Sequence, residues 1–404
     1  MKAPALAITL LAALTAPVVA ASGAKSSVAP PAPPFAGVYQ PQGTDEIGLW
    51  RESDERERVL ANSRLLIRDE ALNAYVRGVL CESIGDDRCR SVRIYILRVP
   101  LFNASMTPNG TMEVFSGLLL RARSEAELGA VLGHEFGHFE RRHTLEKFKA
   151  GRSSSNMLAW SALLTSMSGS RAAYQSFDNM QLSVLGGLAR FGRDQEREAD
   201  LLGLGYLNGS KLRASAASRM WRAFIMEQEA SAAARGLRKP DLDHNAFFAS
   251  HPSDGERADY LYALAAPDGE QRDEGADRYA TAMAKWLPLF LDDQIALNDF
   301  GASDFIINRL GENGWTAPLW RARGDLFRAR GNPRDLMNAA DFYAKAVALD
   351  PNAADAQRGL GLSLMKTGRM SEGGEALRAY LRLRPDASDR AMIETTLAMA
   401  GTGS

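Results

Sequence analysis

The pattern that most constrains this chain is His134-Glu135-Phe136-Gly137-His138, in which two histidines lie four residues apart. The chain has only five histidines in 404 residues, so chance rarely produces this spacing. Residues four apart on a helix lie on one face, one turn apart, so both imidazoles can bind one metal ion. Neutral imidazole suits zinc, and Glu135 is placed to take a proton from an attacking water. The pattern therefore predicts a zinc site on a helix, with Glu135 as the catalytic base.

A catalytic zinc usually has three protein ligands, so a third ligand must come from elsewhere in the chain. The run Glu196-Arg197-Glu198-Ala199-Asp200 offers carboxylates, and Glu196 and Asp200 are four residues apart. On one helix face, one carboxylate can bind the metal while the other hydrogen-bonds a metal-binding histidine. Spacing alone leaves both Glu196 and Glu198 open as the third ligand. A charged helix face that is simply solvated is the plainer alternative.

The sequence around these motifs predicts mostly helices and two strands. Ser124 followed by Glu127 fits a capping box, which predicts a helix that runs from there to about Lys149. Apolar spacing and β-rich alternation indicate the other elements. Helices are expected at 52–63, 69–80, 193–207 and 212–234, and strands at 92–97 and 111–115.

Residues 151–190 are rich in Ser, Met and Leu and include a mildly amphipathic stretch from Met157 to Met167. We interpret this segment as ordinary packing or as a loop that covers the site. Contact with a membrane surface is the alternative. Residues 235–255 are polar and rich in turn-forming residues, and they include His251-Pro252.

The N-terminus has the pattern of a secretory signal peptide at 1–21, with Lys2 followed by a short apolar run and small residues. A retained anchor is the alternative, although the run is marginal for crossing ~30 Å of hydrocarbon. Residues 22–45 are rich in Pro and Ser and predict an extended linker. We therefore expect an exported protein.

The only two cysteines, Cys81 and Cys89, flank a polar turn. In an exported chain this arrangement predicts a disulfide that closes a small loop. Two unpaired thiols are the alternative. Metal binding by this pair is not expected, because no second ligand pair lies nearby in the sequence.

The last third of the chain is rich in Ala, Leu and Arg and contains an internal repeat. Leu349-Asp350-Pro351 recurs as Leu383-Arg384-Pro385 after 34 residues, and Ala339 and Tyr343 supply the small and large residues of the repeat. This pattern resembles two tetratricopeptide repeats over 316–390. Such repeats form surfaces that bind peptides or proteins. A generic helical tail is the alternative.

The two metal-site motifs together give the chain a specific resemblance. The segments 134–138 and 196–200 are similar to those of metallopeptidase family 48, the gluzincin group of HtpX-like and BepA-like enzymes. The resemblance implies that His134, His138 and Glu196 hold one zinc ion per chain. It also implies that Asp200 supports a metal-binding histidine.

Further segments extend this resemblance. Asn103 and Ala104 resemble the family's Asn-Ala segment, and the strand there would offer an edge for an extended substrate. The family's usual Leu-Pro-Gly-Gly turn is here Thr107-Pro108-Asn109-Gly110. His251 corresponds to a histidine that approaches the zinc or binds the transition-state oxyanion, with a loop or capping role as the alternative. His143 and His244 are expected at exposed or supporting positions.

The predicted fold class is mostly α (α+β), a gluzincin-type zinc metallopeptidase domain with a small β-sheet followed by an α-helical tetratricopeptide-like domain. The expected segments after the linker are the peptidase domain at 46–265, a helical connector at 266–315, the repeats at 316–390 and a tail at 391–404. With 48 basic and 49 acidic residues, the chain lacks the basic excess of nucleic-acid binders.

The export signal, the peptidase motifs and the repeats together resemble the BepA-like periplasmic subgroup. They imply a zinc metalloendopeptidase for misfolded or misassembled envelope proteins, with repeats that recruit substrate or outer-membrane assembly proteins. Membrane contact is expected to be peripheral at most. One alternative is a chaperone-like adaptor whose peptidase is latent. Another is an aminopeptidase, for which the sequence identifies no acidic anchor.

Overall fold

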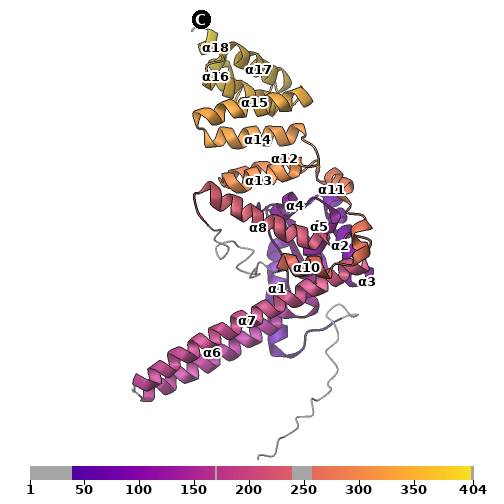
Figure 1. Cartoon of the computed structure of the whole chain (residues 1–404), viewed down its shortest axis with the longest axis vertical. Coiled ribbons are helices and arrows are strands. Elements are labelled where there is room, and N and C mark those ends of the chain that lie inside the picture. The colour runs from indigo at the N-terminus through magenta and orange to yellow at the C-terminus, as the bar shows by residue number, and fades with distance from the viewer. Residues whose placement is uncertain (1–38, 169–170, 239–256, 402–404) are drawn as a thin grey trace, which may run out of the picture. The chain divides into compact units, whose positions relative to one another are not determined.

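The computed structural model of the protein describes residues 39–168, 171–238 and 257–401 (Figure 1). The predicted signal peptide, most of the predicted linker, His244 and His251 lie outside these residues. Helices α1 (Gly43–Ala61), α2 (Glu70–Ile84) and α3 (Asp86–Cys89) precede the strands β1 (Arg93–Leu97), β2 (Ala104–Met106) and β3 (Thr111–Phe115). The helices that follow are α4 (Ser116–Arg121), α5 (Glu125–Glu140), α6 (His143–Ser168), α7 (Arg171–Gly209) and α8 (Ala216–Ala234).

The rest of the described chain is also helical. It comprises α10 (Arg257–Leu264), the 3-10 helix η1 (Pro267–Gln271), α11 (Ala276–Met283), α12 (Leu287–Ala296), α13 (Phe300–Gly311), α14 (Ala317–Arg330), α15 (Pro333–Leu349), α16 (Ala354–Lys366), α17 (Met370–Leu383) and α18 (Arg390–Gly401). The predicted class, mostly α with one small sheet, is confirmed. Among the described helices, none is both long and apolar enough to cross a membrane.

The sheet has the order β1-β3-β2, so β3 lies in the middle, parallel to β1 and antiparallel to β2. The sequence predicts β1 and β3 within one residue. The local residue pattern does not predict β2, because Ala104–Met106 is short and has no β-branched or aromatic residue. Only the family resemblance implies a strand at Asn103 and Ala104. The turn expected at Pro108–Gly110 is present, and Gly110 takes a φ of 88° that favours glycine.

The predicted long helix after Ser124 is broken in the structure. Oγ of Ser124 accepts a hydrogen bond from the backbone N–H of Glu127 and caps α5, as expected. However, α5 ends at Glu140 rather than near Lys149, because Arg142 takes a left-handed φ of 56°. The Arg142 guanidinium lies over the ring of Tyr39 and 3.9 Å from the Glu46 carboxylate. These contacts hold a turn that local sequence does not encode, and α6 then starts in a new direction.

The segment interpreted as ordinary packing or a covering loop is helical, so the loop interpretation is wrong. Residues 143–168 form α6 and residues 171–209 form α7, and the two helices run side by side (Figure 1). The helix predicted at 193–207 is therefore only the C-terminal part of α7.

One continuous hydrophobic core joins the sheet, α2, α5 and α8 to α12, α13 and the near side of α14. Two smaller clusters lie among the helices from α14 to α18. Tyr343 of α15 is fully buried, and a Cβ atom at Gly324 of α14 or Gly359 of α16 would lie 2.7 or 2.3 Å from its ring. Glycines thus let three successive helices pack closely around Tyr343. The assignment to tetratricopeptide repeats stays a prediction.

Glu57 joins α1 to the sheet and gives a prediction for acid stability. Its carboxylate accepts hydrogen bonds from Arg93 at 2.5 and 2.6 Å and from the Tyr95 hydroxyl at 2.9 Å. The hydrogen bonds from Arg93 are the largest cause that lowers the pKa of Glu57 from 4.5 to about 2. Because the folded pKa is depressed, the stabilisation is present above about pH 4.5 and is lost as pH falls toward 2.

We therefore expect Glu57→Gln to destabilise the protein at pH 6 and to matter progressively less below pH 4.5. Urea unfolding of wild type and variant at several pH values measures this difference. Glu55→Gln is the control, because Glu55 is exposed and pairs only with Arg58, one turn along the same helix, among the described residues. A difference between wild type and Glu57→Gln that stays constant from pH 6 to 3 would contradict the assignment.

Candidate metal centre

The centre lies where α5 crosses α7 at short distance. A Cβ atom at Gly203 would lie 2.9 Å from the backbone nitrogen of His134, and one at Gly137 would lie 3.1 Å from the carbonyl oxygen of Ala199. Glycine on both helices therefore lets the two backbones approach. This approach brings the 134–138 turn of α5 against the 196–200 turn of α7.

Three side chains direct donor atoms into one small space. Nε2 of His134 and Nε2 of His138 are 3.1 Å apart. The Glu196 oxygens lie 3.5 Å from Nε2 of His134 and 3.3 Å from Nε2 of His138. Tetrahedral zinc with bonds of about 2.0–2.1 Å places neighbouring ligand atoms roughly 3.3 Å apart, so this donor set fits zinc. Among the described residues, it is the one cluster of this kind that does not involve disulfide-bonded cysteines.

Spacing in the sequence left both Glu196 and Glu198 open as the third ligand. In the structure, it is Glu196 whose oxygens lie beside the two histidines. Glu198 points elsewhere, since its oxygens lie 3.0 Å from Nε of Arg141 and 3.3 Å from Nε2 of His143. Glu196 is buried, whereas the side chain of Glu198 is about half exposed. The structure thus brings together His134, His138 and Glu196, the three residues that the resemblance implies.

Asp200 supports His134 from the side away from the donor set. Its Oδ1 lies 2.9 Å from Nδ1 of His134, so Nδ1–H donates to the carboxylate and Nε2 is left for a metal. Burial alone lowers the pKa of His134, but hydrogen bonds to Asp200 and Glu196 outweigh it and raise the pKa to about 9. A proton and a metal therefore compete for this ring in the metal-free protein.

Arg257 is the main residue of this site that sequence reasoning missed. It is buried at the start of α10, and Nε and Nη2 donate to the two Asp200 oxygens at 2.8 and 2.6 Å. Its guanidinium also lies 4.1 Å from the ring centre of Trp221, and Nη1 is 3.4 Å from Glu196. The Tyr260 hydroxyl donates a further hydrogen bond to Asp200.

This arginine compensates the buried carboxylates. Burial alone raises the pKa of Asp200, but the charge of Arg257 and the hydrogen bond from His134 hold it well below its usual range. Two carboxylates and two histidines gathered inside a fold need a cation nearby, which is the signal that could have directed attention to Arg257.

His143 is also closer to the centre than expected. The turn at Arg142 folds it back, so that its Nδ1 lies 2.8 Å from Nδ1 of His138 and its Nε2 3.3 Å from Glu198. Because Nε2 of His138 faces the donor set, its Nδ1 carries the proton and donates to His143. His143 is buried and corresponds to the supporting position that the sequence left open, not to an exposed one.

Removing this support should weaken metal binding. We expect His143→Ala to lower zinc affinity roughly 10- to 100-fold, because the orientation of His138 is no longer fixed. Competition with a fluorescent chelator measures the affinity. Asparagine at 143 should restore part of it, and Thr144→Ala, an exposed neighbour, is the control. Unchanged zinc affinity in a folded His143→Ala protein would show that His143 does not position His138.

Glu135, Asn103 and Ala104 are further predicted site residues within the described part of the chain. Glu135 is buried on α5 between the two histidines. Asn103 precedes β2, Ala104 begins it, and β2 lies beside α5 as an edge strand. Among the described residues, Oδ1 of Asn103 is a buried acceptor without a hydrogen-bond partner. The predicted role of His251 falls outside the described residues.

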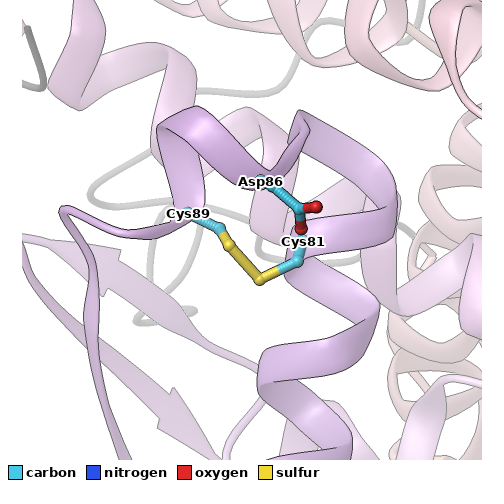
Figure 2. A group of neighbouring side chains, drawn as sticks. All are labelled: Cys81, Asp86 and Cys89. Carbon is cyan, nitrogen blue, oxygen red and sulfur yellow. A yellow bond between two sulfur atoms is a disulfide. The ribbon is translucent and has the colours of Figure 1, made fainter.

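The cysteines lie in a different part of the fold. Figure 2 shows a disulfide between Cys81, near the end of α2, and Cys89 of α3, with Cα atoms 5.1 Å apart. Asp86 lies beside them, so the three residues resemble a metal cluster in composition. Because both sulfurs are used by the disulfide, no thiolate is available to bind a metal there. The bond ties α2 to the short helix that leads into β1.

Comparison with known proteins finds one family and several relatives that resemble part of this chain. Residues 67–265 match the model of a family described as peptidase family M48. The chain is 30% identical over 186 residues to the mitochondrial metalloendopeptidase OMA1 of Schizosaccharomyces pombe. This match covers 46% of this chain and 50% of that protein. It is 29% identical over 160 residues to a putative beta-barrel assembly-enhancing protease of Vibrio cholerae. That match covers 38% of this chain and 33% of that protein.

A shorter match, 41% identical over 56 residues, joins the chain to the mitochondrial metalloendopeptidase OMA1 of Arabidopsis thaliana and covers 14% of this chain and 12% of that protein. The chain thus spans at most about half the length of these curated relatives. The family match contains every residue of the donor set, Glu135, Asp200 and Arg257. These findings confirm the family that the motifs imply, and residues 67–265 of the chain are a peptidase family M48 domain.

Proposed function

We propose that this protein is a zinc-dependent metalloendopeptidase that hydrolyses peptide bonds in polypeptides. The observation that carries the proposal is the convergence of His134, His138 and Glu196 at distances that fit zinc, with Glu135 buried between the histidines. Membership of a peptidase family and the names of two relatives, a metalloendopeptidase and an assembly-enhancing protease, support it.

His134, His138 and Glu196 would hold the zinc ion. When bound, zinc supplies Lewis-acid chemistry that polarises the scissile carbonyl and makes water a better nucleophile. Glu135 takes the proton of the attacking water and later delivers it to the leaving amine. Asp200 keeps the proton of His134 on Nδ1, and Arg257 keeps Asp200 ionised.

The edge of β2 would hold the substrate. An extended peptide can pair with an edge strand through backbone hydrogen bonds. β2 has β3 on one side only and lies beside α5, so a peptide added there would run past the donor set. The buried Oδ1 of Asn103 is suited to accept a hydrogen bond from the substrate backbone.

We further propose that the substrates are misfolded or misassembled envelope proteins in the periplasm, recruited through the helices of residues 316–390. The export pattern at 1–21, the repeat spacing of 34 residues and the name of the Vibrio cholerae relative support this finer proposal. His251 is proposed as a regulator or oxyanion-binding residue on the resemblance alone.

Metal removal tests the proposed activity. We expect the purified protein to cleave fluorescently labelled casein, to lose this activity with 1,10-phenanthroline, and to regain it when about one zinc ion per chain is returned. Cleavage that survives chelation with no zinc left in the protein would refute a zinc mechanism. A protein that loads zinc but never cleaves casein, including as His251→Ala, would favour the chaperone-like adaptor.

The cellular role needs its own experiment. Quantitative proteomics of the periplasm and outer membrane should show envelope proteins that accumulate when Glu135→Gln replaces the wild type. If the accumulating proteins belong to another compartment, the envelope proposal is wrong while the peptidase proposal stands.

A further inference from the structure

We infer that α6 carries a binding face for the surface of an anionic phospholipid membrane. The face consists of Met157, Trp160 and Leu163, and we call it the α6 apolar face. It lies outside the metal centre and beyond the proposed peptidase activity. Contact with a membrane surface was the alternative interpretation of residues 151–190, and the α6 apolar face is the part of that segment that would make this contact.

The three side chains are large, apolar and exposed. Trp160 is 67% exposed, Met157 47% and Leu163 49%. They follow each other at three-residue spacing, so they share one side of the helix within about a third of its circumference. An exposed tryptophan flanked by aliphatic side chains matches the amphipathic residues that lie at the boundary between headgroups and acyl chains.

The sequence from the middle of α6 to the middle of α7 is poor in charge. The 37 residues between Arg152 and Arg190 include only two charged side chains, Arg171 and Asp178. At the chain's own average of 24% charged residues, about nine would be expected. A water-exposed helix pair normally keeps charges along its outer faces. Their near absence is typical of a segment that meets a medium in which charge is costly.

The charges that remain fit an anionic surface. Residues 143–193 contain six basic and two acidic residues, a formal charge of +4, whereas the whole chain has −1. Lys149 and Arg152 precede Trp160 and Leu163 by eleven residues each, which is three helical turns, so they lie on the same side of α6. Long basic side chains at this distance can reach lipid phosphates while the apolar face enters the interface.

Part of this basic charge is already paired within the protein. Arg152 pairs with Asp45 of α1, and Lys149 pairs with Glu146 at 3.2 Å. The side chains of Lys149 and Arg152 are each about half exposed, so both can also contact lipid phosphates. The apolar side chains are therefore expected to supply most of the affinity, and the basic residues the preference for anionic lipid.

A bilayer surface explains these features better than a protein partner. A protein interface usually surrounds its apolar centre with a polar rim that includes charged groups. Here the poverty in charge extends along both helices for 37 residues. Neither helix is long and apolar enough, within the described residues, to cross a membrane, which favours a face that lies on the bilayer.

Vesicle flotation without detergent tests this inference. Vesicles of phosphatidylethanolamine with a quarter phosphatidylglycerol are compared with vesicles of pure phosphatidylcholine. Wild-type protein should float with the anionic vesicles, bind more weakly at high salt, and bind phosphatidylcholine little. The variant Met157→Ser/Trp160→Ser/Leu163→Ser should lose roughly tenfold or more in partitioning. Every variant keeps the same N-terminus, so any contribution of residues 5–21 is common to all.

The matched control is Leu65→Ser/Met226→Ser/Leu264→Ser, which removes three side chains of similar exposure, 51%, 53% and 50%, that lie outside α6, α7 and residues 316–390. This control should float like the wild type. Zinc content and casein cleavage of both triple variants should equal those of the wild type, which shows that each is folded.

A second measurement does not depend on the triple variant. Lipids brominated near the headgroup should quench tryptophan fluorescence of the wild type more than that of Trp160→Phe. Equal quenching, or equal flotation of both triple variants, would overturn the inference. So would a loss of self-association or of unfolded-protein binding in the α6 variant without any loss of vesicle binding, because the face would then serve another copy or a polypeptide.

Discussion

Glutamine in place of Glu135 is expected to lower kcat for polypeptide cleavage by about 10²–10⁴-fold while zinc stays at about one ion per chain. The carboxylate is buried on the same helical turn as the two histidines, so glutamine fits the same volume. An amide cannot accept the proton of the attacking water. The substitution thus removes proton transfer and leaves the donor set intact.

Steady-state kinetics on a quenched fluorescent peptide and zinc analysis of the same preparation check this result. Glu146→Gln on α6 is the control, because Glu146 is about half exposed and near the centre only in sequence. KM should change little, since Glu135 acts in the transition state. A zinc-loaded Glu135→Gln protein with wild-type kcat would mean that another group accepts the proton.

Arg257→Met is expected to lower the free energy of unfolding of the metal-free protein by about 3–5 kcal/mol. Arg257 and Asp200 are both buried, and the guanidinium donates to both carboxylate oxygens. Methionine fills a similar apolar volume but leaves the Asp200 charge without its main compensation. An uncompensated buried charge is costly even when the removed pair contributes little by itself.

A double variant separates charge from packing. Arg257→Met/Asp200→Asn should recover most of the lost stability, because asparagine is neutral and its carbonyl can still accept from Nδ1–H of His134. Guanidinium chloride unfolding of the wild type, both single variants and the double variant completes the cycle. If the double variant is as unstable as the sum of the single losses, then packing rather than charge explains the effect of Arg257.

The donor set could be predicted because it depends on local helix geometry. Residues four apart on a helix share a face in any fold, so His134 with His138 and Glu196 with Asp200 follow from spacing. The choice of Glu196 over Glu198 required the family resemblance. The position of one helix against the other could not be derived, because it depends on packing between segments 60 residues apart.

The missed features share a physical cause. The break at Arg142 is held by Tyr39 and Glu46, which are about 100 residues away, while the local sequence favours a continuous helix. The position of His143 beside His138 follows from that break. Arg257 gives no periodic signal, because its role is to balance charges that only the folded chain brings together.

The crossing at Gly203 shows that this centre depends partly on the absence of a side chain. A Cβ atom at 203 would lie 2.9 Å from the backbone nitrogen of His134 on α5, which is too close, so any other residue would push the two helices apart. No metal-binding atom would change, yet the donors on the two helices would no longer meet at zinc distances. A search for inactive variants that inspects only the histidines and carboxylates would overlook this kind of lesion. In this fold, the geometry of a charged site is governed by the smallest residue beside it.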